Sequence, residues 1–194
     1  KNKITRDMKV YVEVGKPRVS YREAITGTCE SARGLFKKQS GGRGQFGDCT
    51  IKLEPYTAEQ AEEAGLKFTD SIAFENAIVG GAIPKECIPA VEVGVRQTAK
   101  SGVSAGYPLI NIKATLMDGK YHDVDSSQIA FEQAGRLALM EAVGKAGSVL
   151  LEPIMKVVIT TPEDYLGNVT GDLSSRRGMI MDTEDRGFVK IITS

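Results

Sequence analysis

The sequence is poor in the residues that usually build metal, redox and hydrolytic sites. It contains a single histidine, His122, three cysteines and no tryptophan among 194 residues. Cys29, Cys49 and Cys87 form no C-x-x-C pair, so we expect reduced thiols and no metal site. No apolar run approaches the ~18 residues that cross a bilayer, and the charged N-terminus leads into no secretion signal. These absences predict a cytoplasmic protein without membrane association.

Nucleotide-binding motifs are also missing. No G-x-x-x-x-G-K-[ST] run is present, so we expect this chain neither to bind nor to hydrolyse GTP, and to be no enzyme by itself. Residues 42–47 match G-x-G-x-x-G, but a dinucleotide site needs a helix N-terminus after the last glycine. Residues 49–53 instead alternate apolar and polar side chains, which predicts a strand. The glycine motif is therefore no dinucleotide site.

Charge is balanced overall and uneven locally. Lysine plus arginine and aspartate plus glutamate number 25 each, so the net charge predicts no polyanionic partner. However, residues 31–47 contain four cations and no acid, whereas residues 54–75 are predominantly acidic. One basic protrusion on a neutral chain can still bind phosphate locally. The four cations are Arg33, Lys37, Lys38 and Arg43.

Hydrophobic periodicity predicts a long hairpin in the first third of the chain. Residues 8–36 read as extended, residues 39–47 are rich in glycine, and residues 49–53 alternate again. Strand, glycine-rich tip and strand together predict a hairpin. Residues 55–65 are expected to form a loop or one helical turn, and residues 66–68 a short strand.

Two helices and one strand are predicted farther along. Apolar positions indicate a helix over residues 88–101, with Pro89 tolerated in its first turn, and a half-buried strand over residues 110–116. A loop at residues 118–123 follows. Asp125 has capping-box spacing, so the next helix is predicted to start at Ser126. Its small-residue face can lie close to a sheet, and comprises Ala130, Ala134, Leu137 and Ala138.

A boundary is predicted at residues 144–148, followed by a smaller unit. We expect a strand over 154–159, a helix that begins at Thr161-Pro162 and stops at 176–178, and two strands over 179–181 and 188–192. This unit of about 46 residues is smaller than the ~55 at which small domains usually fold alone. It is therefore expected to be truncated.

Two interpretations of the glycine-rich tip stay open at this point. It can be an ordinary flexible hairpin end, as many glycine-rich loops are. Alternatively, its backbone N–H groups can approach phosphates closely, while Lys37, Lys38 and Arg43 neutralise charge and Gln45 hydrogen-bonds a base or sugar edge. Both interpretations fit the residues.

His122 lies in a polar segment and also has two interpretations. A lone histidine in a loop is commonly solvated, with no chemical role. A small enzyme that uses His122 with Asp123 or Asp125 is the alternative, but the sequence offers no nucleophile or metal set for it. Asp118, Asp123 and Asp125 do not continue into the glycine and glutamate of a calcium-binding loop, so that motif is rejected.

Seven stretches, taken in order, resemble the elongation factor G family over essentially the whole chain. They are VGKPRVSYRE (14–23), KKQSGGRGQFGD (37–48), GGAIPK (80–85), AGYP (105–108), YHDVDSS (121–127), LEPIM (151–155) and GDLSSRRG (171–178). The resemblance implies an α+β fold. Residues 1–148 would be the fourth domain of the family, with a left-handed β-α-β crossover, and residues 149–194 the start of a ferredoxin-like fifth domain. The GTPase domain, with its GTP and Mg²⁺, would lie upstream.

The resemblance also implies a function and a site. The family moves tRNA and mRNA through the ribosome. The tip of its fourth domain enters the decoding-centre side of the A site and contacts the tRNA anticodon stem and mRNA, while the fifth domain contacts large-subunit RNA near the stalk base. We therefore expect a non-catalytic, monomeric arm that blocks backward slippage of tRNA. Two loops would meet at its tip, and the expected RNA-binding residues are Lys37, Lys38, Ser40, Gly41, Gly42, Arg43, Gly44, Gln45, His122 and Asp123.

One departure from the family pattern leaves alternatives open. After Gly178 the family usually continues with a Gly-x-Glu-Pro-Arg-Gly-like turn, whereas this chain has DTEDRG at 182–187. The departure is compatible with a paralogue that acts in ribosome recycling or ribosome protection. A stand-alone RNA-binding module without a GTPase is a further alternative.

Overall fold

A computed structural model describes residues 19–39 and 44–194. The chain divides into two compact units between Glu152 and Pro153. Each unit has its own sheet and its own buried side chains, and each is described separately below.

The first unit is built on a five-stranded sheet with the order β2-β3-β6-β5-β4. Neighbours pair antiparallel except β5 and β6, which run parallel. The predicted hairpin is confirmed: β2 and β3 pair from Cys29↔Leu53 out to Lys38↔Gln45. The strands are β2 (Cys29–Lys38), β3 (Gln45–Pro55), β4 (Phe68–Thr69), β5 (Ile72–Asn76) and β6 (Ile112–Lys120).

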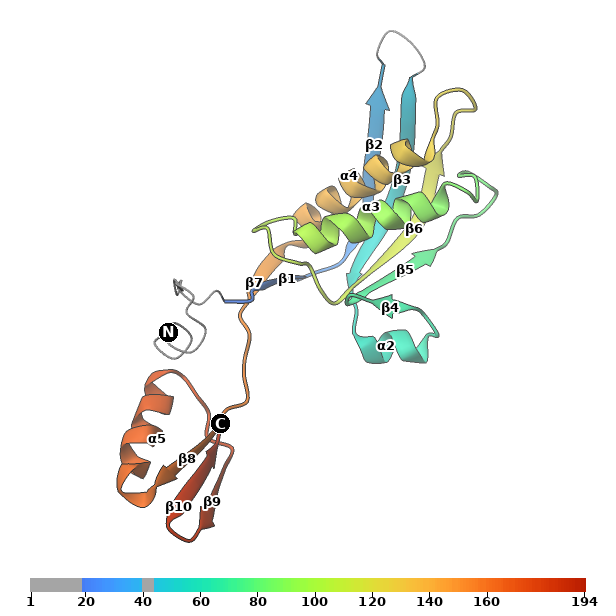
Figure 1. Cartoon of the computed structure of the whole chain (residues 1–194). Coiled ribbons are helices and arrows are strands. Elements are labelled where there is room, and N and C mark those ends of the chain that lie inside the picture. Colours follow the sequence, from blue (N-terminus) through green and yellow to red (C-terminus); the bar gives the residue numbers. More distant parts are fainter. Residues whose placement is uncertain (1–18, 40–43) are drawn as a thin grey trace, which may run out of the picture. The chain divides into compact units, whose positions relative to one another are not determined.

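The parallel pair is joined by α3 (Ile88–Ser101), and this crossover is left-handed, as the family resemblance implies. In Figure 1 the chain rises along β5, returns through α3 in front of the sheet and enters β6 to the left of β5. The predicted helix over 88–101 is confirmed, and Pro89 lies in its first turn, where its missing N–H has no intrahelical partner to lose. The fold therefore contains an uncommon connection, since nearly all such crossovers are right-handed.

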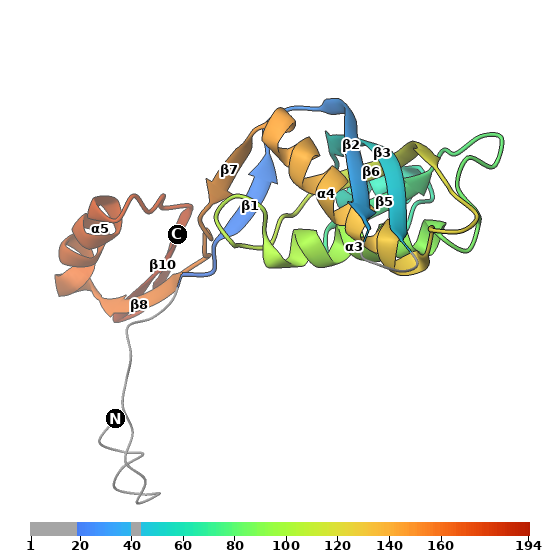
Figure 2. The same cartoon turned by 90° about the horizontal axis from the view of Figure 1, so that it is seen from above.

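The second long helix, α4 (Gln128–Ala146), packs with α3 on one face of the sheet (Figure 2). Its backbone lies unusually close to the hairpin. A Cβ atom placed on Gly34 would lie 1.9 Å from the Ala134 carbonyl oxygen, and one on Gly47 would lie 2.4 Å from that of Ala130. Only glycine fits at such distances, so β2 and β3 each contribute a glycine to the interface. The predicted small-residue face is confirmed at Ala130, Ala134 and Ala138, which are fully buried.

Apolar side chains from the sheet and the two helices form a single core in the first unit. Phe131 and Leu139 from α4, and Val91 and Val95 from α3, are fully buried against the sheet. Burial of side chains of this size contributes about 1.5–3 kcal/mol each relative to exposure. The sheet side of this core includes Ile51, Leu53, Ile72, Ile112, Ala114 and Leu116.

The loop between α3 and β6 is held by a buried carboxylate, that of Glu23. Glu23 lies in β1 (Arg22–Ile25), which pairs with β7 (Ser148–Leu151) in a two-stranded ribbon. Its side chain accepts hydrogen bonds from four backbone N–H groups of residues 102–107, the anchored loop. Burial raises the pKa of Glu23, but the four hydrogen bonds together lower it by more, so that the pKa lies below its ordinary value. The donors are Val103 (3.0 Å), Ser104 (3.0 Å), Ala105 (2.7 Å) and Tyr107 (3.1 Å).

The second unit is a small β-α-β-β arrangement with the sheet order β8-β10-β9. This is the order of the first three strands of a ferredoxin-like domain, as expected. The helix ends at the predicted stop: Arg177 has a left-handed φ of 63°, and the Gly178 N–H donates to the Leu173 carbonyl at 2.8 Å. The elements are β8 (Val158–Pro162), a 3₁₀ turn (Glu163–Tyr165), α5 (Leu166–Ser175), β9 (Asp182–Arg186) and β10 (Val189–Thr193).

The predicted start of α4 is wrong by two residues. The N-cap is Ser127, whose side chain accepts from the Ala130 N–H, and the helix begins at Gln128 rather than Ser126. Asp125 does not cap the helix, because its backbone carbonyl accepts from the Phe46 N–H of β3. In addition, Leu137 does not belong to the buried face, since its side chain is 39% exposed.

Other boundaries also differ from prediction. Strand β6 continues through the predicted loop at 118–120, because these residues pair with residues 48–50 of β3. Strand β5 was not predicted. Helix α2 (Ala58–Glu63), which a Thr57 capping box begins, lies in the segment 55–65 that was predicted to be a loop or one helical turn. In the second unit, Thr161 and Pro162 pair with β10 and remain in β8, so the helix starts later. The strand predicted at 179–181 forms instead at β9.

Candidate nucleic-acid interface

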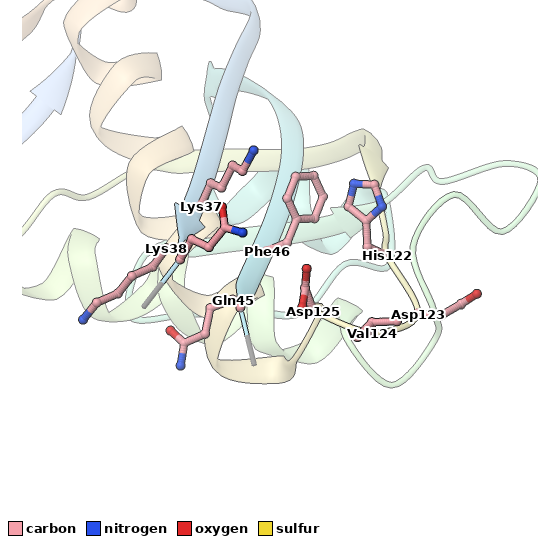
Figure 3. Close-up of a pocket in the computed structure, with 10 residues that line it drawn as sticks. Lys37, Lys38, Gln45, Phe46, His122, Asp123, Val124 and Asp125 are labelled. Atoms are coloured by element: carbon pink, nitrogen blue, oxygen red, sulfur yellow. The ribbon is translucent and has the colours of Figure 1, made fainter. Parts of the chain in front are cut away.

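The far end of the hairpin forms a groove with the segment that joins β6 to α4 (Figure 3). We name residues 122–126 of this segment the tip loop and the hollow beside it the tip groove. The groove has a volume of about 440 Å³. Ten described residues line it: Lys37, Lys38, Gln39, Gly44, Gln45, Phe46, His122, Asp123, Val124 and Asp125.

Phe46 joins the hairpin to the tip loop in two ways. Its backbone N–H donates to the Asp125 carbonyl at 2.8 Å, and Phe46 and Ser126 form a parallel bridge. Its ring also meets the imidazole of His122, with centroids 4.1 Å apart and planes at 72°, which is an edge-to-face contact. Figure 3 shows the two rings next to each other, with the Asp125 carboxylate beside them.

The tip loop is closed on itself as well. The His122 N–H donates to the Ser126 hydroxyl at 3.0 Å, and the Ser126 N–H donates to the His122 carbonyl at 3.0 Å. The helix cap at Ser127 follows immediately. The loop therefore presents His122 from a short, internally bonded turn, and the His122 side chain itself is exposed.

Cations at the tip are available to a ligand, whereas cations lower on the sheet are paired. Lys37 and Lys38 are exposed, and neither forms an ion pair with another described residue. By contrast, Arg33 donates to both carboxylate oxygens of the buried Asp48, and this partner raises its pKa. Lys52 bridges Glu30 and Glu54 at 3.2 and 3.4 Å. Among these described cations of the hairpin, Lys37 and Lys38 at the tip groove have no ion-pair partner among the described residues.

The structure brings together all six of the sequence-predicted site residues that it describes. Lys37, Lys38, Gly44, Gln45, His122 and Asp123 all line the tip groove. Ser40, Gly41, Gly42 and Arg43 lie outside the described residues. Figure 3 shows Asp123 pointing away from the two rings. The expected RNA-binding residues did not include Gln39, Phe46, Val124 or Asp125. Phe46 stands inside the glycine motif next to Gln45, and that position could have marked it.

The described residues of the groove offer hydrogen bonding, charge and aromatic surface. In the described part of the chain, no three His, Cys, Asp or Glu side chains are grouped so as to hold a metal ion. The three cysteines are buried, and burial raises the pKa of the Cys49 thiol to about 12, so it stays protonated. Over the same residues, no helix is long and apolar enough to span a membrane.

Comparison with protein families assigns both units. Residues 17–147 match the family model described as elongation factor G, domain IV, and residues 149–194 match the one described as elongation factor G C-terminus. The chain therefore belongs to the elongation factor G family. The matched parts do not include a GTPase domain.

A solved structure gives the same relationship. The chain resembles a protein from Thermus thermophilus, with a TM-score of 0.81 and 38% sequence identity over 97% of this chain. The matched region is 26% of that protein, so the chain spans about a quarter of its length. The likeness covers both units of the chain.

Proposed function

We propose that this chain is the ribosome-contacting arm of a translational GTPase, and that it promotes movement of tRNA and mRNA. Its tip would occupy the decoding-centre side of the A site and contact the tRNA anticodon stem and mRNA. The second unit would contact large-subunit RNA near the stalk base. The observation that carries the proposal is the tip groove, where cations, an amide and an exposed imidazole meet at the end of a domain that matches this family.

The chemistry of the groove suits a nucleic acid. Lys37 and Lys38 supply positive charge for phosphates, and Gln45 supplies an amide that can both donate to and accept from a base edge. His122 adds a flat ring of the kind on which unpaired bases stack. The glycine-rich sequence of residues 41–44 would allow the backbone to approach RNA closely. These properties favour the RNA-binding interpretation of the tip over a plain flexible turn.

The arm would act by occupying space rather than by making or breaking bonds. After GTP hydrolysis in another domain, it would fill the position vacated by tRNA and block its return. In this role the tip needs a fixed shape and weak, numerous contacts, and it needs no nucleophile. Among the described residues, the His122 ring contacts Phe46 and its backbone hydrogen-bonds within the tip loop, and neither contact supplies the nucleophile that the enzyme interpretation needs.

The decisive test is a single round of translocation by the full-length parent protein on purified ribosomes, with GTP hydrolysis followed in parallel. We expect the wild type to move mRNA. The His122→Ala variant should hydrolyse GTP normally and move mRNA at least about tenfold more slowly, because one base-stacking surface is lost. Lys100→Ala, a substitution on α3 at an exposed lysine that pairs with Asp70 at 3.0 Å, is the matched control and should behave as wild type. Equal rates for wild type and His122→Ala would exclude the tip as the working part.

A paralogue that acts in ribosome recycling or ribosome protection is the second candidate, and one observation favours it. Strand β9 lies where the sequence departs from the family pattern, and all five of its residues are exposed. Three of the five are acidic, which disfavours RNA along this edge of the second unit. If the wild-type parent splits ribosomes or protects them without moving mRNA, this candidate replaces the translocase.

A further inference from the structure

We propose that Phe46 is a positioning residue that holds His122 in place for RNA, so that the two halves of the tip act as one preformed surface. The inference rests on the proposed function, because it assigns a role within the same RNA site. In this proposal Phe46 affects RNA binding through the position of the His122 side chain and not through its own contact with RNA.

The first support is the main-chain link between β3 and the tip loop. The 2.8 Å bond from the Phe46 N–H to the Asp125 carbonyl, with the parallel bridge from Phe46 to Ser126, attaches the loop to β3 at the pair Lys37↔Phe46, next to the last pair of the hairpin. This bond does not depend on the side chain at position 46. It brings the loop to the strand but leaves the orientation of the His122 ring undetermined.

The second support is the ring contact. His122 is exposed and makes no side-chain hydrogen bond with another described residue, so the edge-to-face contact with Phe46 is what orients its imidazole. Phe46 is half-buried and lines the groove together with His122. A histidine held against a neighbouring ring loses less rotational freedom when it binds a base.

The third support comes from the opposite side of the same strand. Side chains alternate across a strand, so Phe46 and Gly47 face opposite sides of the sheet. Gly47 lies against the Ala130 carbonyl of α4, close enough that no Cβ would fit without a shift. The helix therefore contacts one face of β3 at Gly47, and Phe46, the preceding residue, contacts the tip loop. The position of Phe46 is thus restrained by the packing of its neighbour against α4.

The test uses the fact that His122 is the only histidine in the chain, so its imidazole gives one set of signals in a ¹H–¹³C NMR spectrum. An aromatic ring 4.1 Å away displaces those signals from their free-histidine positions. Phe46→Ala should move them toward the free-histidine positions, and Phe46→Tyr should restore them. Tyr21→Ala is the matched control, since it removes the Tyr21–Tyr107 ring contact (5.2 Å, 61°) away from the tip and should leave the His122 signals unchanged.

The same variants are then titrated with an RNA hairpin that carries an anticodon stem–loop. Phe46→Ala should weaken binding about two- to tenfold, Phe46→Tyr should restore it, and the melting temperature should change no more than in the Tyr21→Ala control. Because Phe46 acts through His122, the double variant Phe46→Ala/His122→Ala should bind no more weakly than His122→Ala alone.

The outcomes separate this inference from the function on which it rests. If the His122 signals do not move in Phe46→Ala, or if the two substitutions weaken RNA binding additively, Phe46 does not position His122. If the signals move as expected while the wild-type chain binds neither the RNA hairpin nor the ribosome, the proposed function fails. In that case Phe46 positions His122, but for no RNA, and the inference as stated is overturned with the function.

Discussion

Two connecting segments of the first unit are held in opposite ways. The anchored loop at 102–107 is fixed by a buried side chain, the Glu23 carboxylate, which accepts four backbone N–H groups. The tip loop at 122–126 is held by bonds between His122 and Ser126 and by a bond from β3 to the Asp125 carbonyl, while its His122 side chain stays exposed. The anchored loop thus surrounds a buried carboxylate that comes from β1. The tip loop instead carries an imidazole that is exposed.

The difference separates residues that maintain the fold from residues that are free for a ligand. A carboxylate that is fully occupied by the backbone has no capacity left for a partner molecule, so Glu23 is expected to matter for stability alone. An imidazole held by ring contact keeps both nitrogens for a partner. The three predictions that follow test this separation, in order of decreasing expected effect.

The largest effect is expected for Glu23→Gln. The amide keeps the shape of the side chain, but it replaces one acceptor oxygen with an NH₂ group that faces backbone donors. We expect a loss of ~2–4 kcal/mol in the free energy of unfolding, because charged hydrogen bonds are lost and buried N–H groups lose their partner. Urea denaturation measures this loss. The folded variant should bind RNA as wild type does, and a weakened RNA affinity would mean that the two segments are coupled.

The pH dependence of the same substitution is the next largest effect. The folded pKa of Glu23 lies below its ordinary value, so the stabilisation that Glu23 provides is present above that ordinary value and is lost as the pH falls through the folded pKa. The difference in unfolding free energy between wild type and Glu23→Gln should therefore be largest near neutral pH and should shrink in acid. Urea titrations at a series of pH values measure it. A difference that stays constant down to low pH would show that the charge on Glu23 is unimportant.

The smallest effect concerns the tip cations. Lys37→Ala should reduce the slope of log affinity against log salt by about one, since one phosphate contact is lost, and should leave stability within about 0.5 kcal/mol of wild type. Lys100→Ala is the control, because that lysine is also exposed but is paired with Asp70. RNA titrations at several salt concentrations check both. Equal slopes for Lys37→Ala and wild type would remove Lys37 from the interface. We make the same prediction for Arg43→Ala.

The elements that could be predicted from sequence are those whose own side chains specify them. Alternation in residues 49–53 and the apolar face of residues 88–101 each predicted the correct element, because each buries one side against a single core. Strand β9 could not be predicted in this way: all its side chains are exposed, and it forms because its backbone pairs with β10. The start of α4 failed for a related reason, since the Asp125 carbonyl bonds to a strand far away in sequence.

The residues of the candidate site also differ in whether the sequence alone could predict them. Composition alone showed the cations at Lys37 and Lys38 and the amide at Gln45. That His122 belongs beside them came from the resemblance to the family, because no local pattern links residue 46 to residue 122. The role we infer for Phe46 depends on a ring distance and on the bond to Asp125, which only coordinates provide.

The close contact between α4 and the hairpin has a mechanical consequence. Where side chains separate two elements, rotamer changes can absorb a force, but Gly34 and Gly47 place the backbone of β2 and β3 directly against the backbone of α4. At these two glycines the hairpin is held directly against the helix, with no side chains between them that could rearrange. A force on the far end of the hairpin is therefore transmitted to the body of the domain and bends the hairpin little. The role proposed above, in which the arm blocks the return of tRNA, would require that stiffness.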